Sequence, residues 1–342
     1  MILETIEVGG CRSYILGCPN THVGAVIDPE ISAIERYRGL AARHGLTLRY
    51  AIDTHTHADH FSAALEIGKA LGAQVVMSHL SPAPHVDIKL DDGDLLLIGE
   101  IRLQAMATPG HTADSTSLYT QGHVFTGDAL LIGGTGRTDL PTGDPEQLYD
   151  SLFNRLLRLD PATEIHPAHE YKGRAGSTIG EEITSNPRLQ KTDRADFVAM
   201  MRALNIQAPT HLTEALRVNM SGAKSVARLL SEASASVPFM AMDELSRRIA
   251  ARQNDLVILD VREKDAFDAG HLPGAVHLPR GQLELRVNEA FPDPTVRIVA
   301  VCDFGKISTL AAATLRSLGF RHASALDGGM KAWREAGLTT EQ

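Results

Sequence analysis

Short apolar runs, broken by glycine and proline, dominate the first part of the chain. They predict strands at residues 2–8, 13–16, 24–27, 48–53, 74–77 and 164–166. Apolar positions at helical spacing predict helices at residues 31–44, 61–71 and 145–159. A strand-rich stretch at residues 95–125 contains a predicted hairpin turn at Gln121-Gly122. Because strands and helices interleave, the pattern predicts an α/β or α+β class with polar residues at the strand ends.

The pattern changes after residue 180, where helical and loop segments take over. The small, polar segment at residues 231–238 predicts a weakly structured linker. A further α/β unit is predicted from about Met240, with strands at residues 256–259 and 297–301 and a helix at 309–318. We therefore expect a first domain at residues 1–225, a linker at 226–239 and a second domain at 240–342.

Length, charge and cysteine content narrow the class of protein. The chain has 342 residues and a formal net charge of −9, from 33 Lys and Arg against 42 Asp and Glu. This charge argues against binding to nucleic acid or to an anionic membrane. The N-terminal segment lacks the pattern of a signal peptide, and no apolar stretch is long enough for a membrane span. Three cysteines do not make a disulfide framework, so we expect a cytoplasmic enzyme.

Histidine and aspartate gather directly after the predicted strand at residues 48–53. His55, His57, Asp59 and His60 lie within six residues, and alternation along an extended segment turns His55 and His57 to the same side. Nitrogen and carboxylate ligands in one turn suit a borderline divalent metal such as zinc or iron(II). The alternative, a helix N-cap at Asp59 beside exposed histidines, does not account for so dense a cluster.

Polar side chains also follow three further predicted strands. His111 lies in a Pro-Gly turn, Asp128 comes soon after Val124-Phe125, and His169 follows the strand at residues 164–166. Taken alone, each is more typical of a turn or a capped strand end. Their order after the first cluster favours one common site.

The ordered motifs THTHADH, GHT and GD, followed by a late histidine, resemble those of the metallo-β-lactamase superfamily over about residues 1–180. The resemblance implies an αβ/βα sandwich with the metal site at one edge of the sheets. Two branches fit: glyoxalase II, a thioester hydrolase with two metals, and persulfide dioxygenase, which uses one iron(II). The segments DALLI, GTGRTD and HEY, at residues 128–132, 134–139 and 169–171, resemble the dioxygenase branch.

Carried over by motif, the resemblance implies one iron(II) per chain held by His55, His111 and Asp128, with zinc as the alternative. The other polar motif residues would orient these ligands or complete a second metal site: His57, Asp59, His60 and His169. The implied reaction is oxidation of glutathione persulfide by O₂ and water to sulfite and glutathione. Arg137 and Tyr171 are the candidates for binding glutathione, and an ion pair with Asp139 is the alternative role for Arg137.

Motifs in the second domain resemble the rhodanese family over about residues 240–340: LDVRE at 259–263, GHLPGAVH at 270–277, and LDGG at 326–329 with Trp333. Cys302 ends a predicted strand, and the amides before the next helix are expected to stabilise its thiolate. The resemblance makes Cys302 the nucleophile that carries sulfur, and a buried structural cysteine is the alternative. Cys11 and Cys18, without a neighbouring base in the sequence, are interpreted as structural.

The loop after Cys302 departs from the usual rhodanese motif. It keeps the glycine and serine but has Asp303 and Ile307 where arginines are typical, in the segment Asp303, Phe304, Gly305, Lys306, Ile307 and Ser308. Lys306 is its only cation, so a dianion such as thiosulfate should bind less well. We expect sulfur transfer, with the preferred donor left open, and a non-catalytic sensing or docking domain as the alternative.

The reactions implied for the two domains share substrates. A rhodanese moves sulfane sulfur between thiosulfate, glutathione persulfide and sulfite, whereas a persulfide dioxygenase consumes the persulfide and makes sulfite. This favours the dioxygenase over a zinc thioester hydrolase fused to a rhodanese-like binding or sensing domain, because a thioester has no sulfane sulfur to exchange. The sequence leaves the oligomeric state open, and a homo-oligomer is compatible with it.

Overall fold

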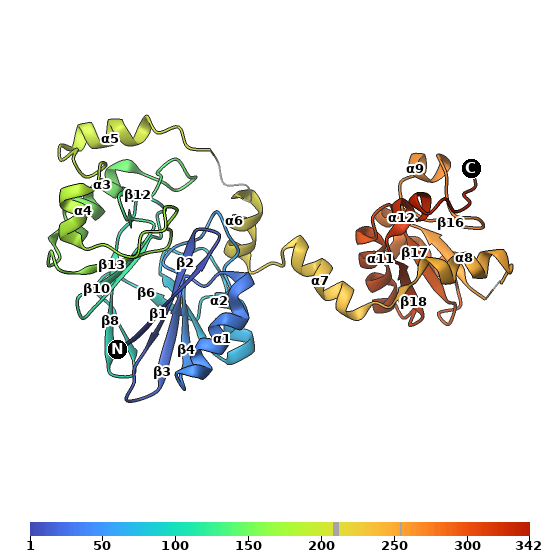
Figure 1. Cartoon of the computed structure of the whole chain (residues 1–342), viewed down its shortest axis with the longest axis horizontal. Helices are drawn as coiled ribbons and strands as arrows, with labels where there is room; N and C mark the ends of the chain where they lie inside the picture. The colour runs from blue at the N-terminus through green and yellow to red at the C-terminus, as the bar shows by residue number, and fades with distance from the viewer. Residues whose placement is uncertain (208–211, 254) are drawn as a thin grey trace. The chain divides into compact units, whose positions relative to one another are not determined.

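The computed structural model describes residues 1–207, 212–253 and 255–342. Contacts within the chain divide it into two compact units, Met1–Ala223 and Lys224–Gln342. Figure 1 shows that each unit combines β-sheet with helices. Within the described ranges, no helix combines the length and the apolar character that crossing a bilayer requires.

The first unit contains two mixed sheets. One has the order β1-β2-β3-β4-β5-β6 and is formed by Ile2–Val8, Cys11–Gly17, Val23–Ile27, Thr47–Ile52, Gln74–Ser78 and Ile88–Leu90. The other has the order β13-β10-β9-β8-β7 and is formed by Glu164–Pro167, His123–Gly127, Thr116–Thr120, Ile101–Ala107 and Leu95–Ile98. The turn between β9 and β10 is the predicted hairpin at Gln121-Gly122, whose positive φ values of 45° and 80° suit a tight turn.

Alternation along the strands puts the sheets face to face. In β2, Tyr14 and Leu16 point into the apolar core between the sheets, whereas Ile15 points to the outer core under the helices. In β10, Phe125 joins the inner core and Val124 the outer core on its own side. The result is an αβ/βα sandwich, which confirms the predicted fold class.

Helices cover the outer faces of the sandwich (Figure 1). On the first sheet, Ile34–Arg43 (α1) and Ala64–Leu71 (α2) contribute apolar side chains such as Tyr37 and Ile67. On the second sheet the covering helices are Pro145–Phe153 (α3), Ile179–Ser185 (α4) and Arg194–Arg202 (α5). A short hairpin, Leu130–Leu131 (β11) with Gly134–Thr135 (β12), and the helix Leu212–Ser221 (α6) complete the unit.

The second unit is built around a parallel sheet of order β14-β18-β17-β15-β16, formed by Phe239–Met240, Ala323–Leu326, Ile298–Val301, Val257–Asp260 and Val276–His277. The central strand β17 is buried on both faces, which explains its unbroken apolar run. The surrounding helices are Met242–Ala250 (α8), Lys264–Asp268 (α9), Leu283–Ala290 (α10), Lys306–Ser317 (α11) and Gly329–Glu335 (α12). This α/β arrangement is the one predicted for the second unit.

The predicted linker is a helix over most of its length. Val226–Ser236 forms α7, capped by the Ser225 side chain, which accepts a hydrogen bond from the Arg228 amide. The helix contacts α11 and therefore belongs to the second unit. The expectation of weak structure was wrong because alanine, leucine and arginine favour a helix, and Val226, Leu229, Leu230 and Ala233 recur at helical spacing.

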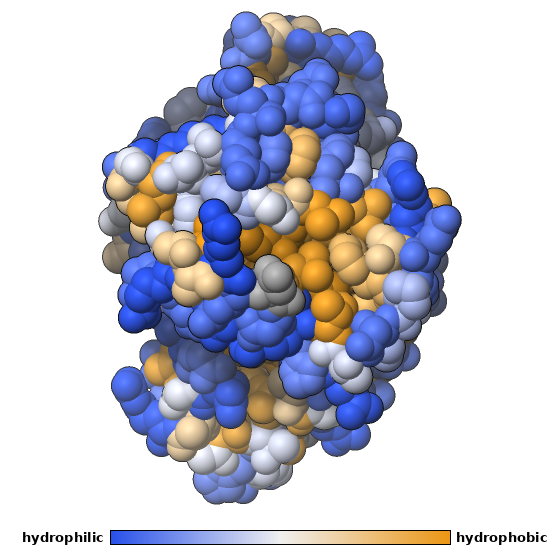
Figure 2. Space-filling view, turned by 90° about the vertical axis from the view of Figure 1, so that its right-hand side faces the viewer, coloured by the Kyte–Doolittle hydropathy of each residue, from blue (hydrophilic) through white to orange (hydrophobic). Residues whose placement is uncertain are grey.

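Most side chains on the face that Figure 2 shows are hydrophilic. Figure 2 shows one face on which apolar side chains gather near the centre among polar and charged ones. Isolated exposed apolar residues are common on folded proteins and carry no conclusion by themselves.

Candidate metal centre and cysteine site

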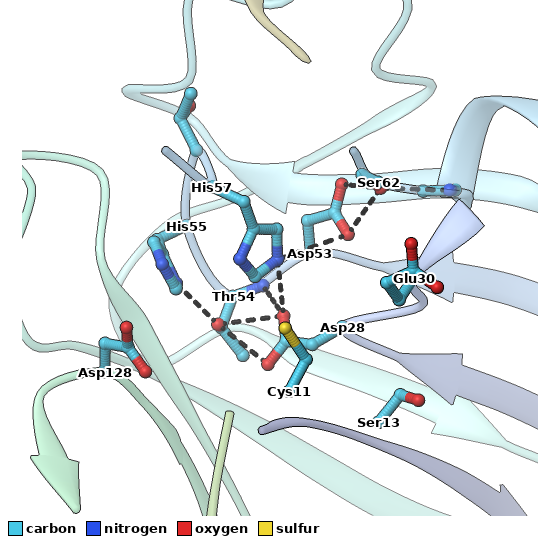
Figure 3. A network of polar contacts seen from close by, with 12 residues as sticks. Cys11, Ser13, Asp28, Glu30, Asp53, Thr54, His55, His57, Ser62 and Asp128 are labelled. Carbon is cyan, nitrogen blue, oxygen red and sulfur yellow. Dashed lines mark hydrogen bonds and ion pairs between the residues drawn. The ribbon is translucent and has the colours of Figure 1, made fainter. Parts of the chain in front are cut away.

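The loop after β4 is held at its start by a buried aspartate. Asp28, at the end of β3, accepts hydrogen bonds from the Thr54 amide (2.7 Å) and hydroxyl (2.9 Å), as Figure 3 shows. The Thr54 hydroxyl in turn lies 3.0 Å from Nδ1 of His55. Because Nδ1 is already engaged, the free nitrogen of His55 is Nε2.

His55, His111 and Asp128 meet at the edge of the two sheets, each following a different strand. Their ligand atoms all lie within 4.8 Å of one another, and all three side chains are buried. His111 is oriented by the Arg137 carbonyl, 2.8 Å from its Nδ1. Its turn needs Gly110, because a Cβ at that position would lie 2.3 Å from the Leu148 amide nitrogen.

The chemistry of this cluster fits a divalent metal. The buried Nε2 of His55 has no hydrogen-bond partner among the described residues, which a ligated metal would provide. Burial, followed by the charge of His57, holds the pKa of His55 well below its usual value, so the ring is neutral and can ligate. Burial raises the pKa of Asp128, but His169 and His111 outweigh it and hold that pKa well below the usual range, which keeps the carboxylate ionised.

His169 joins this cluster to Asp59. Its Nδ1 lies 2.7 Å from Oδ1 of Asp128, and its Nε2 lies 2.7 Å from Oδ2 of Asp59. This contact leaves Oδ2 of Asp128 facing His111, 3.5 Å from its Nε2. The predicted orienting role of Asp59 and His169 thus has a geometric basis.

Cys11 lies in the same site, which corrects its interpretation as a structural residue. Its Sγ is 3.5 Å from Nε2 of His169 and 3.6 Å from Nδ1 of His60, and it forms a ligand-type cluster with these residues and Asp59. Burial raises its pKa, but the contacts with His169 and His60 prevail and bring it to about 7. No local pattern could predict this, because Cys11 meets His169 through a β-bridge between residues 158 positions apart in the chain.

His57 contacts two buried carboxylates beneath the ligand loop. Its Nε2 is 3.2 Å from Asp28 and 3.7 Å from Asp53, so the ring turns to the first sheet and away from Asp128 (Figure 3). Burial lowers its pKa, but the two carboxylates outweigh this and raise the pKa well above its usual value. His57 therefore joins an ion cluster with Asp28 and Asp53 beneath the ligand loop, and its buried Nδ1 has no hydrogen-bond partner among the described residues.

Asn219 of α6 is a residue that sequence reasoning missed. Its Nδ2 donates to the carbonyls of His57 (2.9 Å) and His60 (2.8 Å), and its Oδ1 accepts from the Ser62 amide (3.0 Å). One side chain thus fixes the backbone of the ligand loop. A lone asparagine in a helical segment carries no sequence signal for such a role.

A cavity of about 740 Å³ opens beside His111, Asp128 and His169. Its lining includes several cations and an aromatic ring: Arg137, Tyr171, Lys172, Arg174 and Arg188. Tyr171 stacks on His169 with ring centroids 5.5 Å apart. These cations offer partners for a carboxylate-bearing ligand, and Asp59, Asp128 and Glu170 line the same cavity.

Arg137 is largely occupied within the protein. It pairs through two nitrogens with Asp139, at 2.6 and 2.7 Å, and donates to the carbonyls of residues 206 and 207. This is the ion pair considered as the alternative role for Arg137. Arg188, which donates through Nη1 to Thr135, was not singled out from the sequence and reaches the same cavity.

Cys302 directly follows β17 and is buried under the first turn of α11. Its Sγ accepts a hydrogen bond from the Ser308 amide (3.2 Å) and lies 3.3 Å from the Ser308 hydroxyl. The helix begins at Lys306, three residues earlier than predicted, because Gly305 adopts a φ of 81° and ends the loop. Lys306, Ile307 and Ser308 are therefore helical, and only residues 303–305 form the loop.

Two further features explain the motifs around Cys302. Gly329 lies against the loop so closely that a Cβ would be 2.4 Å from the Cys302 carbonyl oxygen, which accounts for the LDGG sequence. Arg262 pairs with Asp260 (2.7 Å) and also reaches Asp303 (3.2 Å). Asp303 is thus partly neutralised by an arginine outside the loop, whereas Phe304 and Ile307 are exposed.

Comparison with known proteins agrees with both units. Residues 6–169 match the metallo-beta-lactamase superfamily and residues 241–336 match the rhodanese-like domain. Persulfide dioxygenase ETHE1 of Bos taurus is 39% identical over 224 residues, covering 64% of this chain and 87% of the relative. The human enzyme of the same name is 38% identical with the same coverage.

A solved structure supports the same relationship. The crystal structure of ETHE1 from Myxococcus xanthus has a TM-score of 0.63 and 37% identity, and covers 64% of this chain and 98% of that chain. The residues that match the metallo-beta-lactamase superfamily, 6–169, contain His55, His111 and Asp128, and the rhodanese-like match follows at 241–336. The chain therefore belongs to the persulfide dioxygenase family of the metallo-β-lactamase superfamily and carries a C-terminal rhodanese-like domain.

Proposed function

We propose that the first unit oxidises glutathione persulfide with O₂ and water to sulfite and glutathione, using one iron(II) per chain. We further propose that Cys302 transfers sulfane sulfur between thiosulfate, glutathione persulfide and sulfite. The observation that carries the first proposal is the cluster of His55, His111 and Asp128 beside an open cavity. A two-histidine, one-carboxylate set is typical of oxygen-activating iron sites that keep positions open.

Iron held there would supply the redox chemistry that oxidation of a persulfide by O₂ requires, and zinc lacks the redox states for it. His55, His111 and Asp128 would hold it. Asp59 and His169 keep the Asp128 carboxylate in place. The cationic lining of the cavity, with Arg188 better placed than the paired Arg137, would bind the glutathione carboxylates.

At the second site, the Cys302 thiolate attacks the outer sulfur of a donor such as thiosulfate. The sulfur–sulfur bond of the donor breaks, sulfite leaves with the bonding electrons, and a cysteine persulfide remains. The Ser308 amide donates to the sulfur. A glutathione thiolate then takes the outer sulfur and releases Cys302. The free cysteines are consistent with a reducing compartment, and we retain the cytoplasm as the proposed location.

The first test is the metal content of anaerobically purified protein, combined with O₂ uptake on addition of glutathione persulfide. We expect about one iron per chain and persulfide-dependent O₂ uptake that is lost in His111→Ala. For the second site, Cys302→Ala should abolish sulfur transfer and leave O₂ uptake intact. Unchanged sulfur transfer in that variant would leave the domain as a sensing or docking module.

A zinc thioester hydrolase is the second candidate. The cluster of Cys11, Asp59, His60 and His169 favours it, because these groups beside Asp128 offer ligands for a second metal. Two zincs per chain, hydrolysis of lactoylglutathione and no O₂ uptake would establish that function in place of the dioxygenase.

A further inference from the structure

A group of metal-ligand side chains lies at the far end of β10 from Asp128. His123 begins that strand, and Glu164 and His166 lie on the neighbouring strand β13. A ligand atom from each lies within 4.8 Å of the others. None of these residues has a part in the persulfide chemistry or the cysteine site proposed above.

The parallel pairing of β10 and β13 brings these side chains together. His123 is opposite Glu164, and Phe125 is opposite His166, so alternation directs all three ligand groups to the same face. Nδ1 of His123 lies 3.0 Å from Nε2 of His166 and 3.5 Å from Oε2 of Glu164. Ligand atoms at these separations can share one ion with bonds of about 2.0–2.2 Å.

His166 is held rigidly in this position. Its ring stacks on Phe125, with centroids 4.9 Å apart, and meets the edge of Tyr14 at 5.4 Å. Burial, then the neighbouring His123 and Arg12, lower the pKa of His166 to about 4, so the ring is neutral near pH 7 and keeps a lone pair for a metal. The Arg12 charge is itself offset by an ion pair with Glu7.

The other two groups give access from solvent. The side chain of His123 is 22% exposed and that of Glu164 is 59% exposed. A cation can therefore reach the cluster and keep water at its remaining position. Two imidazole nitrogens and one carboxylate suit zinc and similar borderline metals, whereas Ca²⁺ and Mg²⁺ prefer ligand sets of oxygen.

We propose that His123, Glu164 and His166 bind one Zn²⁺ at a site separate from the metal centre on His55, His111 and Asp128. Bound there, the ion joins the edge strand β13 to β10. The alternative explanation for the short distance between His123 and His166 is a hydrogen bond between the two rings without a metal.

The test is a zinc titration of the full-length protein in competition with a chromophoric chelator, after the metal content of the purified protein has been determined. We expect one additional zinc per chain. His123→Gln and His166→Phe should each weaken zinc binding roughly 100-fold or more. Substituting a residue that only orients a ligand already lowers metal affinity by about 10–100-fold, and these substitutions remove a ligand itself. His44→Gln is the matched control, since His44 also pairs with a glutamate, Glu4, at 2.7 Å.

No additional zinc in the wild type, or equal zinc affinity in wild type and both ligand variants, would overturn the proposal. Circular dichroism and the metal content of the original centre verify that the variants fold. Anomalous diffraction from zinc-soaked crystals gives an independent reading: a peak between the three side chains supports the site, and zinc found only elsewhere contradicts it.

Discussion

His169 shows how a single side chain controls the metal centre. It touches Asp128 and Asp59 with opposite ring nitrogens, both at 2.7 Å. In His169→Gln one flexible amide replaces this rigid bridge, and we expect metal affinity to fall by about 10–100-fold, as for other residues that orient ligands. Metal content after dialysis against a weak chelator measures the effect, with His44→Gln as the control. Unchanged metal retention and O₂ uptake would contradict this role for His169.

The lowered pKa of His166 predicts that the stability of the zinc-free protein depends on pH. Its pKa in the folded state is about 4, against a usual value of 6.5, because burial, His123 and Arg12 disfavour the charged ring. The unfolded chain therefore takes up this proton first, and the contribution of His166 to stability is lost as the pH falls from about 6.5 to 4, by roughly 3 kcal/mol. In His166→Phe the side chain at this position cannot take up a proton in either the folded or the unfolded state.

The melting temperatures of wild type and His166→Phe, compared at a series of pH values, test this. The wild type should lose more stability than the variant between pH 6.5 and 4, and the two should run parallel above pH 7. Parallel curves over the whole range would mean that His166 titrates normally.

At the level of elements, α6 stabilises the ligand loop through Asn219. In Asn219→Ala the carbonyls of His57 and His60 and the Ser62 amide lose their partner, which should destabilise the first unit by about 1–3 kcal/mol. We also expect weaker metal retention, because the loop carries His55. Asn154→Ala, which removes an exposed contact with Asp150, is the control and should change neither melting temperature nor metal content. If Asn219→Ala has the same melting temperature and metal content as Asn154→Ala, Asn219 does not stabilise the ligand loop.

Elements with a strong local pattern could be predicted, and those defined by distant contacts could not. The strand predicted at residues 2–8 is observed as Ile2–Val8, and β4 is shifted by one residue from its prediction. The glycines and the alternation of apolar residues mark these strands locally. In contrast, α7 packs against α11, and the small, polar residues of its second half favour a linker when they are taken alone.

The metal site follows the same division. His55, His111 and Asp128 could be predicted because each comes soon after an apolar strand in a known order. Cys11 could not, since its contact with His169 joins residues 158 positions apart. The orientation of His57 depends on Asp28 and Asp53, whose carboxylates compete for the ring. A sequence motif specifies which residues meet, but not which way each ring turns.

At the scale of the whole molecule, the proposed reactions form a sequence on one chain. Thiosulfate and glutathione give glutathione persulfide and sulfite at Cys302, and the metal centre then consumes the persulfide with O₂. The units have separate apolar cores, so a substitution at one site should leave the other folded. Thiosulfate with glutathione should therefore drive O₂ uptake in the wild type.

This uptake should disappear in both Cys302→Ala and His111→Ala, for different reasons. The first variant should still consume O₂ when glutathione persulfide is supplied directly, and the second should accumulate the persulfide from thiosulfate. Mixing the two variants should restore O₂ uptake, because glutathione persulfide released by one variant can diffuse to the other. If the mixture is slower than wild type at equal concentrations of each active site, the difference in rate measures the benefit of tethering. Uptake from thiosulfate that persists in Cys302→Ala would show that sulfur reaches the metal centre without the cysteine site, and the proposed sequence would be wrong.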